Sequence, residues 1–445
     1  MLVKASQYNF SWSMNEEKKL LIYNSFSTRM IVIDNKHSDL LDKGSFDINE
    51  LADGKKFVAK SLLKKGFLIH HSIDELKVLQ FSSQKYKHDT SRLSLTIAPT
   101  LSCNFRCIYC DQEERNRPAM SKEVEDAILK YIEDKVKKLD EISITWYGGE
   151  PLLEPDILIN LSQKITALAK GHGCECVFKI VTNGYLLEPE LVAKLKELNI
   201  QVIQITLDGP PSIHNKRRKL FGSDDDTFNK ILLNIKNLIK NDIKFTIRVN
   251  IDQTNVEGIE ELLDILANNG IPKNSVNFAQ VYTYTDACKS AAHTMMSTNE
   301  YAKIEPLLYE MMVEKGLMED FTHLLPKRKS NYCGADHIQS YVIDPEGDMY
   351  KCWSDFGDKN IRIGNIVTQK STKEEKMKHV RWIMWSPFDS EKCIRCKMLP
   401  ICMGGCPDLG MREGKPHCLA TQYQLEKIIK KNYHQAEKIS GFWTM

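Results

Sequence analysis

The sequence predicts an α/β protein centred on a partial (β/α)6 barrel, preceded by a winged-helix-like domain and followed by a cysteine-rich domain. In residues 93–316, β-branched runs alternate with longer amphipathic segments, which is typical of β-α units around a mostly parallel sheet. Short strand-like runs occupy residues 1–85, and seven of the thirteen cysteines lie beyond residue 330. We therefore expect domains at 1–85, 92–316 and 325–425, with 426–445 as a C-terminal helix or tail.

The composition is that of a globular chain with two or three domains. Its 445 residues exceed one usual compact core, and 42% hydrophobic with 27% charged residues is ordinary for a soluble protein. No apolar run approaches the ~20 residues of a membrane span, and the N-terminus lacks an apolar signal segment, so we expect a cytoplasmic location. A net charge of +2 gives no strong field for nucleic acid or anionic lipid. In a reducing compartment, thirteen cysteines favour metal binding or catalysis over disulfides.

Residues 1–85 are expected to form a winged-helix-like domain. Three short strands are predicted at 8–13, 19–23 and 29–33, followed by helical patterns at 40–51 and 57–65. Such a domain binds either DNA or an extended peptide that adds to a strand edge. Thirteen Lys or Arg against ten Asp or Glu make no basic face, which favours the peptide. The polar stretch 82–91 is interpreted as a linker to the barrel.

The barrel prediction rests on six strand-like runs separated by helical stretches such as 122–138 and 228–241. In parallel α/β sheets, ligands gather at the carboxyl ends of the strands, where the loops converge. Functional residues are therefore expected directly after the strands. The six runs are 93–98, 142–147, 177–182, 202–207, 245–251 and 276–282.

Three cysteines follow the first predicted strand. Cys103, Cys107 and Cys110 have the spacing C-x3-C-x2-C, which lets one short loop surround a single inorganic centre. Thiolates are soft ligands that suit iron–sulfur clusters or zinc. On a four-iron cluster, three thiolates leave one iron for a small chelating molecule. From these residues alone, a three-cysteine zinc site or three core thiols remain as alternatives.

Glycine and short polar side chains mark the next three strand ends. Gly-Gly-Glu at 148–150 follows the second strand, Asn183 the third and Asp208 the fourth. Two adjacent glycines let the backbone approach a ligand closely, although each of these residues also suits an ordinary turn. Arg248 lies inside the fifth strand, where a charge needs a partner such as a bound carboxylate or a core salt bridge.

The cysteine loop together with these strand ends resembles the radical S-adenosylmethionine (SAM) enzymes. The resemblance implies that the three thiolates hold a [4Fe-4S] cluster whose open iron binds the amino and carboxylate groups of SAM. It also implies that residues 148–150 hydrogen-bond the SAM amino group and that Asn183 and Asp208 lie near the ribose or the substrate. The cofactor-binding residues implied are Tyr109, Gly148, Gly149, Glu150, Asn183, Asp208 and Arg248.

The last third of the chain has a second cysteine pattern. Cys333 and Cys352 flank a predicted hairpin with strands at 341–343 and 349–350 and a tight turn at 344–348. A C-x2-C-x5-C-x3-C run and one further cysteine follow. A zinc ribbon would instead need four cysteines in two pairs. The five later cysteines are Cys393, Cys396, Cys402, Cys406 and Cys418.

This second pattern resembles the SPASM domains that follow radical SAM barrels and hold two auxiliary [4Fe-4S] clusters. The resemblance assigns one cluster to Cys393, Cys396, Cys402 and Cys418. It assigns the other to Cys333, Cys352 and Cys406, and so implies three clusters per chain, one of them SAM-binding.

The chain departs from the sulfatase-maturing members of this group at two positions. Gln339 stands where they carry a further cysteine, so the second auxiliary cluster is one ligand short unless Cys288 reaches it. Trp353 stands where they carry an aspartate general base. Both departures argue against sulfatase maturation. Cys174, Cys176 and Cys288 are otherwise expected to be buried core thiols.

A winged-helix-like domain before such a barrel resembles the leader-peptide recognition element of ribosomal-peptide maturases. The expected enzyme cleaves SAM to a 5′-deoxyadenosyl radical, takes hydrogen from a precursor peptide and forms an intrapeptide thioether from a cysteine. Its expected partners are that peptide and a reductant such as flavodoxin or ferredoxin, with no nucleic acid or membrane. The alternatives are carbon–carbon crosslinking of peptide side chains and, in another class, a zinc-ribbon and winged-helix DNA-binding regulator.

Overall fold

The computed structural model describes residues 1–14, 18–110, 112, 118–282 and 285–440. At the N-terminus, an antiparallel sheet has the order β2-β3-β4, and a second small sheet has the order β5-β1-β6. The three strands predicted here are confirmed. The elements are β1 (Leu2–Ala5), β2 (Asn9–Met14), β3 (Lys19–Asn24), β4 (Arg29–Asp34), β5 (Phe46–Asp47), α2 (Asp53–Lys65), β6 (Leu68–His70) and α3 (Glu75–Lys87).

Two predictions for this domain are wrong. The helix expected at 40–51 is only α1 (Asp39–Asp42), because the chain then becomes extended at Lys43 and the Asp47 side chain caps a new short turn by accepting from Asn49 N–H at 2.8 Å. Residues 82–87 of the expected linker are the end of α3, and only residues 88–91 lie outside a helix. Gln84 and Lys85 are exposed, but Ser83 and Lys87 are buried, so this polar stretch packs against the rest of the molecule.

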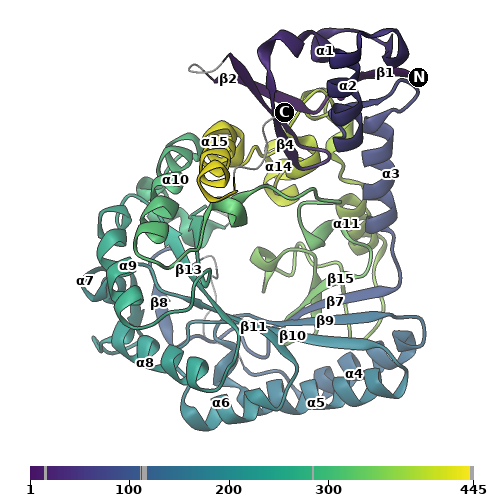
Figure 1. Ribbon diagram of the computed structural model, residues 1–445. Coiled ribbons are helices and arrows are strands. Elements are labelled where there is room, and N and C mark those ends of the chain that lie inside the picture. The colour runs from purple at the N-terminus through teal and green to yellow at the C-terminus, as the bar shows by residue number, and fades with distance from the viewer. Residues whose placement is uncertain (15–17, 111, 113–117, 283–284, 441–445) are drawn as a thin grey trace.

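The centre of the molecule is a nine-stranded sheet with the order β14-β13-β11-β10-β9-β7-β15-β16-β17. All six predicted barrel strands are present and pair in parallel. Figure 1 shows the helices on the outer face of the curved sheet. The strands and these helices share a single large apolar core. The strands are β7 (Arg92–Ile97), β9 (Glu141–Trp146), β10 (Glu175–Thr182), β11 (Ile200–Thr206), β13 (Phe245–Ile251) and β14 (Val276–Gln280). The main covering helices are α4 (Lys122–Val136), α5 (Pro155–Gly171), α6 (Pro189–Lys196), α8 (Thr227–Lys240), α9 (Ile259–Asn268) and α10 (Thr298–Glu314).

The cysteine-rich region extends the barrel sheet instead of forming a separate body. β15 (Ser340–Ile343) pairs in parallel with the edge strand β7, and β16 (Asp348–Tyr350) then turns back antiparallel, as the predicted hairpin requires. β17 (Gly364–Asn365) completes the sheet. Pairing with β7 satisfies the backbone groups of an edge that would otherwise be open.

The C-terminal helix α15 (Thr421–Ser440) lies between the barrel and the N-terminal domain (Figure 1). Leu21 and Tyr23 of β3 share a hydrophobic cluster with Ile401 and with Ile429 of α15. The first and last domains therefore have a common core. Within the described residues, no helix is both long and apolar enough to cross a membrane.

Candidate active site and cluster sites

The loop of the first three cysteines is fixed by a small ribbon. β8 (Phe105–Cys107) pairs antiparallel with β12 (Arg218–Leu220), and Phe105 is fully buried beneath it. Burial, together with the charges of Glu150, Cys107 and Cys110, raises the pKa of the Cys103 thiol to about 12. The three thiols and the Glu150 carboxylate therefore lie close together at the carboxyl ends of β7 and β9. A metal-bound thiol is deprotonated, so a cluster here has to offset that raised pKa.

The glycines at 148 and 149 make room for the cysteine loop. Gly148 has φ +115°, and a Cβ on Gly149 would lie 2.1 Å from the Ser102 carbonyl oxygen. Gly149 N–H donates to Thr100 O at 3.1 Å and Glu150 N–H to Ser102 O at 2.9 Å. The sequence interpretation, close approach to a ligand, is thus incomplete, because the neighbour that these glycines approach in the structure is protein backbone.

Glu150 joins three strand ends. It is 1% exposed, and its carboxylate accepts from Thr182 Oγ1 at 2.7 Å, from Asn183 N–H at 2.7 Å and from Leu152 N–H at 3.0 Å. Burial raises the pKa of Glu150, and these three hydrogen bonds oppose the rise. The Asn183 side chain in turn donates to Asn104 Oδ1 at 2.7 Å, which ties the end of β10 to the cysteine loop.

Asp208 and Tyr109 form a second buried group. The Tyr109 hydroxyl donates to Asp208 Oδ2, and Arg218 Nη1 donates to the same hydroxyl at 2.7 Å. Asn250 N–H donates to Asp208 Oδ1 at 2.9 Å. Burial is the main cause that raises the pKa of Tyr109 well above its ordinary value, so the hydroxyl keeps its proton. Tyr109, the residue before the third cysteine, is therefore held against the end of β11.

Two arginines in this group were missed from the sequence. Arg217 Nη1 contacts Asp252 Oδ1 at 2.8 Å and Oδ2 at 2.9 Å, and Arg218 bonds Tyr109. Adjacent arginines just before a strand are a weak signal, although two buried guanidinium groups always need acidic partners. Arg248 donates to Asn250 Oδ1 at 2.8 Å, and no ion pair involves Arg248 within the described part of the chain.

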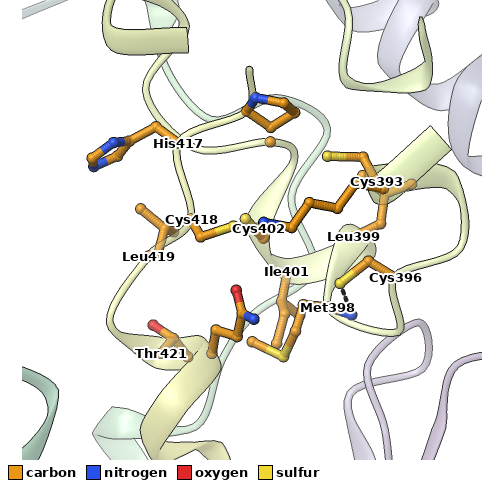
Figure 2. Close-up of a pocket in the computed structure, with 14 residues that line it drawn as sticks. Cys393, Cys396, Met398, Leu399, Ile401, Cys402, His417, Cys418, Leu419 and Thr421 are labelled. Carbon is orange, nitrogen blue, oxygen red and sulfur yellow. Dashed lines mark hydrogen bonds between the residues drawn. The ribbon is translucent and has the colours of Figure 1, made fainter. Parts of the chain in front are cut away.

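Four C-terminal cysteines line one pocket (Figure 2). Burial, together with the charges of Cys393, Cys418 and Cys396, raises the pKa of Cys402 to about 11. A sharp turn after Cys402 brings in the last thiol: a Cβ on Gly405 would lie 1.8 Å from the backbone oxygen of the residue before Cys418. Four thiols around one pocket suit a four-iron cluster.

The second C-terminal group contains the remaining three cysteines of the pattern. Burial raises the pKa of Cys333, and the charges of Asp336 and Cys406 contribute. Burial likewise raises the pKa of Cys352, with contributions from Asp355, Asp408 and Cys333. Pairing of β15 with β7 places this group beside the barrel mouth.

Neither side chain considered as a fourth ligand points to this group. Gln339 is 8% exposed, and its side-chain amide donates to the Thr90 carbonyl. Cys288 lies 3.7 Å from the Tyr109 carbonyl oxygen, so it packs beside the first cysteine loop. The hypothesis that Cys288 reaches the second C-terminal group therefore fails in this structure. Cys174 and Cys176 are buried in the barrel core.

Trp353, directly after Cys352, connects the two regions. Its indole is 41% exposed and lies 4.8 Å from the Tyr147 ring, centroid to centroid. Tyr147 itself precedes the glycines at 148 and 149. An exposed aromatic surface thus lies between the first cysteine loop and the second C-terminal group.

In the described ranges, no three His, Cys, Asp or Glu side chains converge tightly enough to hold a single metal ion.

Comparisons with known proteins agree with this geometry. Residues 97–266 match the model of the Radical SAM superfamily. The cysteine-type anaerobic sulfatase-maturating enzyme of Clostridium perfringens is 25% identical over 71% of this chain and 88% of its own length. The mycofactocin maturase MftC of Mycolicibacterium smegmatis is 26% identical over 71% of this chain and 78% of its own.

Two solved structures share the fold. Native anSMEcpe with bound AdoMet is 22% identical and aligns with a TM-score of 0.59 over 77% of this chain and 100% of that one. Streptococcus suis SuiB bound to precursor peptide SuiA is 17% identical and aligns with a TM-score of 0.55 over 94% of this chain and 98% of that one. The second coverage has to include most of residues 1–90.

Proposed function

We propose that this chain, a radical SAM enzyme similar to peptide-modifying maturases, forms an intrapeptide thioether from a cysteine of a ribosomally made precursor peptide. The observation that carries the proposal is the second C-terminal group, which has three cysteines where the first has four. One iron there would lack a protein thiolate, and a substrate cysteine is the matching ligand. The radical SAM domain counts against a DNA-binding regulator.

We assign the cofactors by the three cysteine groups. Cys103, Cys107 and Cys110 would hold the cluster that binds SAM, and the two C-terminal groups would hold auxiliary clusters. When bound, the clusters and SAM would supply electrons and a 5′-deoxyadenosyl radical that takes a hydrogen atom from the peptide. They would also supply an acceptor for the electron released as the carbon–sulfur bond forms. A flavodoxin or ferredoxin in the cytoplasm would supply the first electron.

The protein side chains at the strand ends would orient SAM and the substrate. Glu150 is held by three donors, yet a carboxylate offers about four acceptor positions, so it has room for the SAM amino group. Asn183 and Asp208 are fixed at neighbouring strand ends, where the ribose or the substrate would lie. Arg248 is the candidate partner for the SAM carboxylate. Holding the reactants in contact lowers the activation free energy by several kcal/mol.

The N-terminal domain would bind the leader of the precursor. β2 and β4 are the two edges of its sheet, and each can accept an extended peptide as a further strand. The SuiB structure, which shares the fold, is described as bound to a precursor peptide. Because Tyr23 of the central strand shares a core with α15, this domain would hold the peptide at a fixed distance from the barrel.

The test is a comparison of product masses. The enzyme would be incubated anaerobically with SAM, a reductant and a cysteine-containing precursor encoded near it, with the same peptide carrying Cys→Ser in parallel. The proposal expects a loss of two hydrogens and one alkylation-resistant sulfur with the first peptide only. 5′-Deoxyadenosine should still form with the second. A loss of two hydrogens that leaves the thiol free would instead establish carbon–carbon crosslinking.

A further inference from the structure

The second C-terminal group has two buried carboxylates beside its three thiols. Asp355 ends the short turn η8 (Trp353–Asp355) after Cys352 and is 4% exposed. Asp408 lies in α14 (Pro407–Glu413), two residues after Cys406, and is 5% exposed. Both are close enough to affect the Cys352 thiol electrostatically. The first C-terminal group, by contrast, is lined by four cysteines and mainly apolar side chains.

One oxygen of Asp408 has no hydrogen-bond partner among the residues that the structure describes. Arg412 Nε donates to Asp408 Oδ1 at 3.0 Å, and Arg412 Nη2 lies 3.8 Å from Asp355 Oδ1. Asp408 Oδ2 is buried, and none of the described groups hydrogen-bonds it. A buried carboxylate oxygen left in this state is destabilising and calls for a ligand, water or ion.

We propose that Asp408 Oδ2 is the fourth protein ligand of the second auxiliary cluster and that a substrate cysteine thiolate replaces it. The inference rests on the proposed function, which places a cluster and a peptide thiolate here. Iron–sulfur clusters accept ligands other than cysteine, as Rieske centres do with histidine. A carboxylate is a harder ligand than a thiolate and holds cluster iron less firmly, so it can be exchanged.

The exchange would balance in atoms: the iron–oxygen bond to Asp408 breaks, the iron–sulfur bond to the substrate forms, and the proton of the substrate thiol leaves to solvent. Because the released carboxylate stays in the site, the site gains one negative charge beside the Arg412 guanidinium. Arg412 already binds Asp408 Oδ1 and keeps the released carboxylate paired. Lys351, whose charge acts on Cys333, is engaged elsewhere, since its Nζ donates to His337 O at 2.7 Å and to Ser340 O at 2.6 Å.

The test titrates free cysteine into the full-length protein while the electron paramagnetic resonance spectrum of the reduced auxiliary clusters is recorded. A background with Cys103→Ala, Cys107→Ala and Cys110→Ala removes the SAM-binding cluster and its signal. In that background, Asp408→Ala should bind free cysteine at a concentration at least about tenfold lower than unaltered Asp408 does. Asp355→Asn is the matched control and should respond like unaltered Asp355.

Asp408→Cys keeps the test decisive if Asp408→Ala fails to retain the cluster. It should keep the iron content and give a spectrum that added cysteine no longer changes. Equal titrations for Asp408→Ala and the unaltered residue, or an Asp408→Cys spectrum that still responds, would overturn the assignment.

Product analysis separates this inference from the proposed function. With the SAM-binding cluster restored, Asp408→Cys should form 5′-deoxyadenosine but no thioether. If the unaltered enzyme forms no thioether from any cysteine peptide, the proposed function fails, while the free-cysteine titration still decides whether Asp408 is a ligand.

Discussion

The two C-terminal cysteine groups are built by different means. The first comes from a local run, Cys393 to Cys402, plus one returning thiol, Cys418, and it lies in largely apolar surroundings. The second needs β15 to pair with β7 and collects buried charges such as Asp355 and Asp408. Four thiolates saturate a cluster and suit electron storage, whereas three thiolates among polar groups leave a position for ligand exchange. By this comparison, the first group would store electrons and the second group would bind a ligand that takes part in the reaction.

The largest expected effect comes from removing the thiols of the first cysteine loop, which leaves only the two C-terminal groups to hold clusters. A variant with Cys103→Ala, Cys107→Ala and Cys110→Ala should lose all 5′-deoxyadenosine formation, because no thiolate remains to hold the SAM-binding cluster. Iron should fall from about twelve to about eight per chain, as three clusters become two. Anaerobic iron and sulfide analysis with chromatography of the nucleoside checks both numbers. Retained SAM cleavage would contradict the assignment of the loop.

The second prediction separates the two groups from each other. Cys396 packs beside the core that joins β3 to α15, so Cys396→Ser should lower the melting temperature and increase hydrogen exchange in β3. Cys406→Ser should leave β3 protected but reduce the yield of crosslinked peptide. Hydrogen–deuterium exchange of the two variants, each with its own iron content, makes the comparison. Equal exchange in β3 would show that the two groups contribute alike to the fold.

The third prediction concerns the aromatic surface between the second group and the barrel. Trp353→Ala removes an aromatic pair with Tyr147 that is worth about 0.5–1.5 kcal/mol of stability, and crosslink yield should fall because this surface lies between the two cysteine regions. Trp353→Phe should restore most of it, and the iron content of both should match the unaltered enzyme. A full crosslink yield from Trp353→Ala would show that the peptide does not depend on this aromatic surface.

The smallest expected effect tests the hairpin that positions the second group. Burial and then the charge of Asp348 raise the pKa of Asp344 to about 6 from an unfolded value near 3.8. The folded state therefore binds the proton more tightly, so its stability from this group is complete below pH 3.8 and is lost as pH rises through about 6. Asp344→Asn should remove that loss and gain about 1–3 kcal/mol at pH 7 relative to pH 4. Urea unfolding at both pH values measures it, and a difference that does not change with pH would contradict the pKa shift.

Much of the fold was predictable because strand periodicity is local. All six barrel strands and the β15–β16 hairpin follow from β-branched runs and turn residues. The pairing of β15 with β7 was not predictable, since a short strand carries no local signal of its distant partner. The helix at residues 82–87 was missed because its polar side chains resemble a linker until the packing of Leu79 is known.

The candidate site was predictable to the extent that chemistry follows spacing. The first cysteine loop comes from spacing, and the division of the seven C-terminal cysteines into two groups comes from the family resemblance. Arg217, Arg218 and the unpartnered oxygen of Asp408 depend instead on which side chains the fold brings together. Gln339 and Cys288 could be named as alternatives at the second group from the sequence. Only the fold shows that they are held at Thr90 and Tyr109.

The core shared by the first and last domains also orders events during synthesis. Tyr23 donates to the carbonyl oxygen of Pro326 at 3.2 Å, and its ring packs with Ile429. The first domain to leave the ribosome can form its own core from residues 3–68, but the shared cluster has to wait for almost the whole chain, and contacts of such separation slow folding. During that interval its apolar β3 face and the cysteines around residue 400 are both accessible. Cluster insertion at those cysteines before the domains close would prevent the N-terminal domain from packing over an empty site.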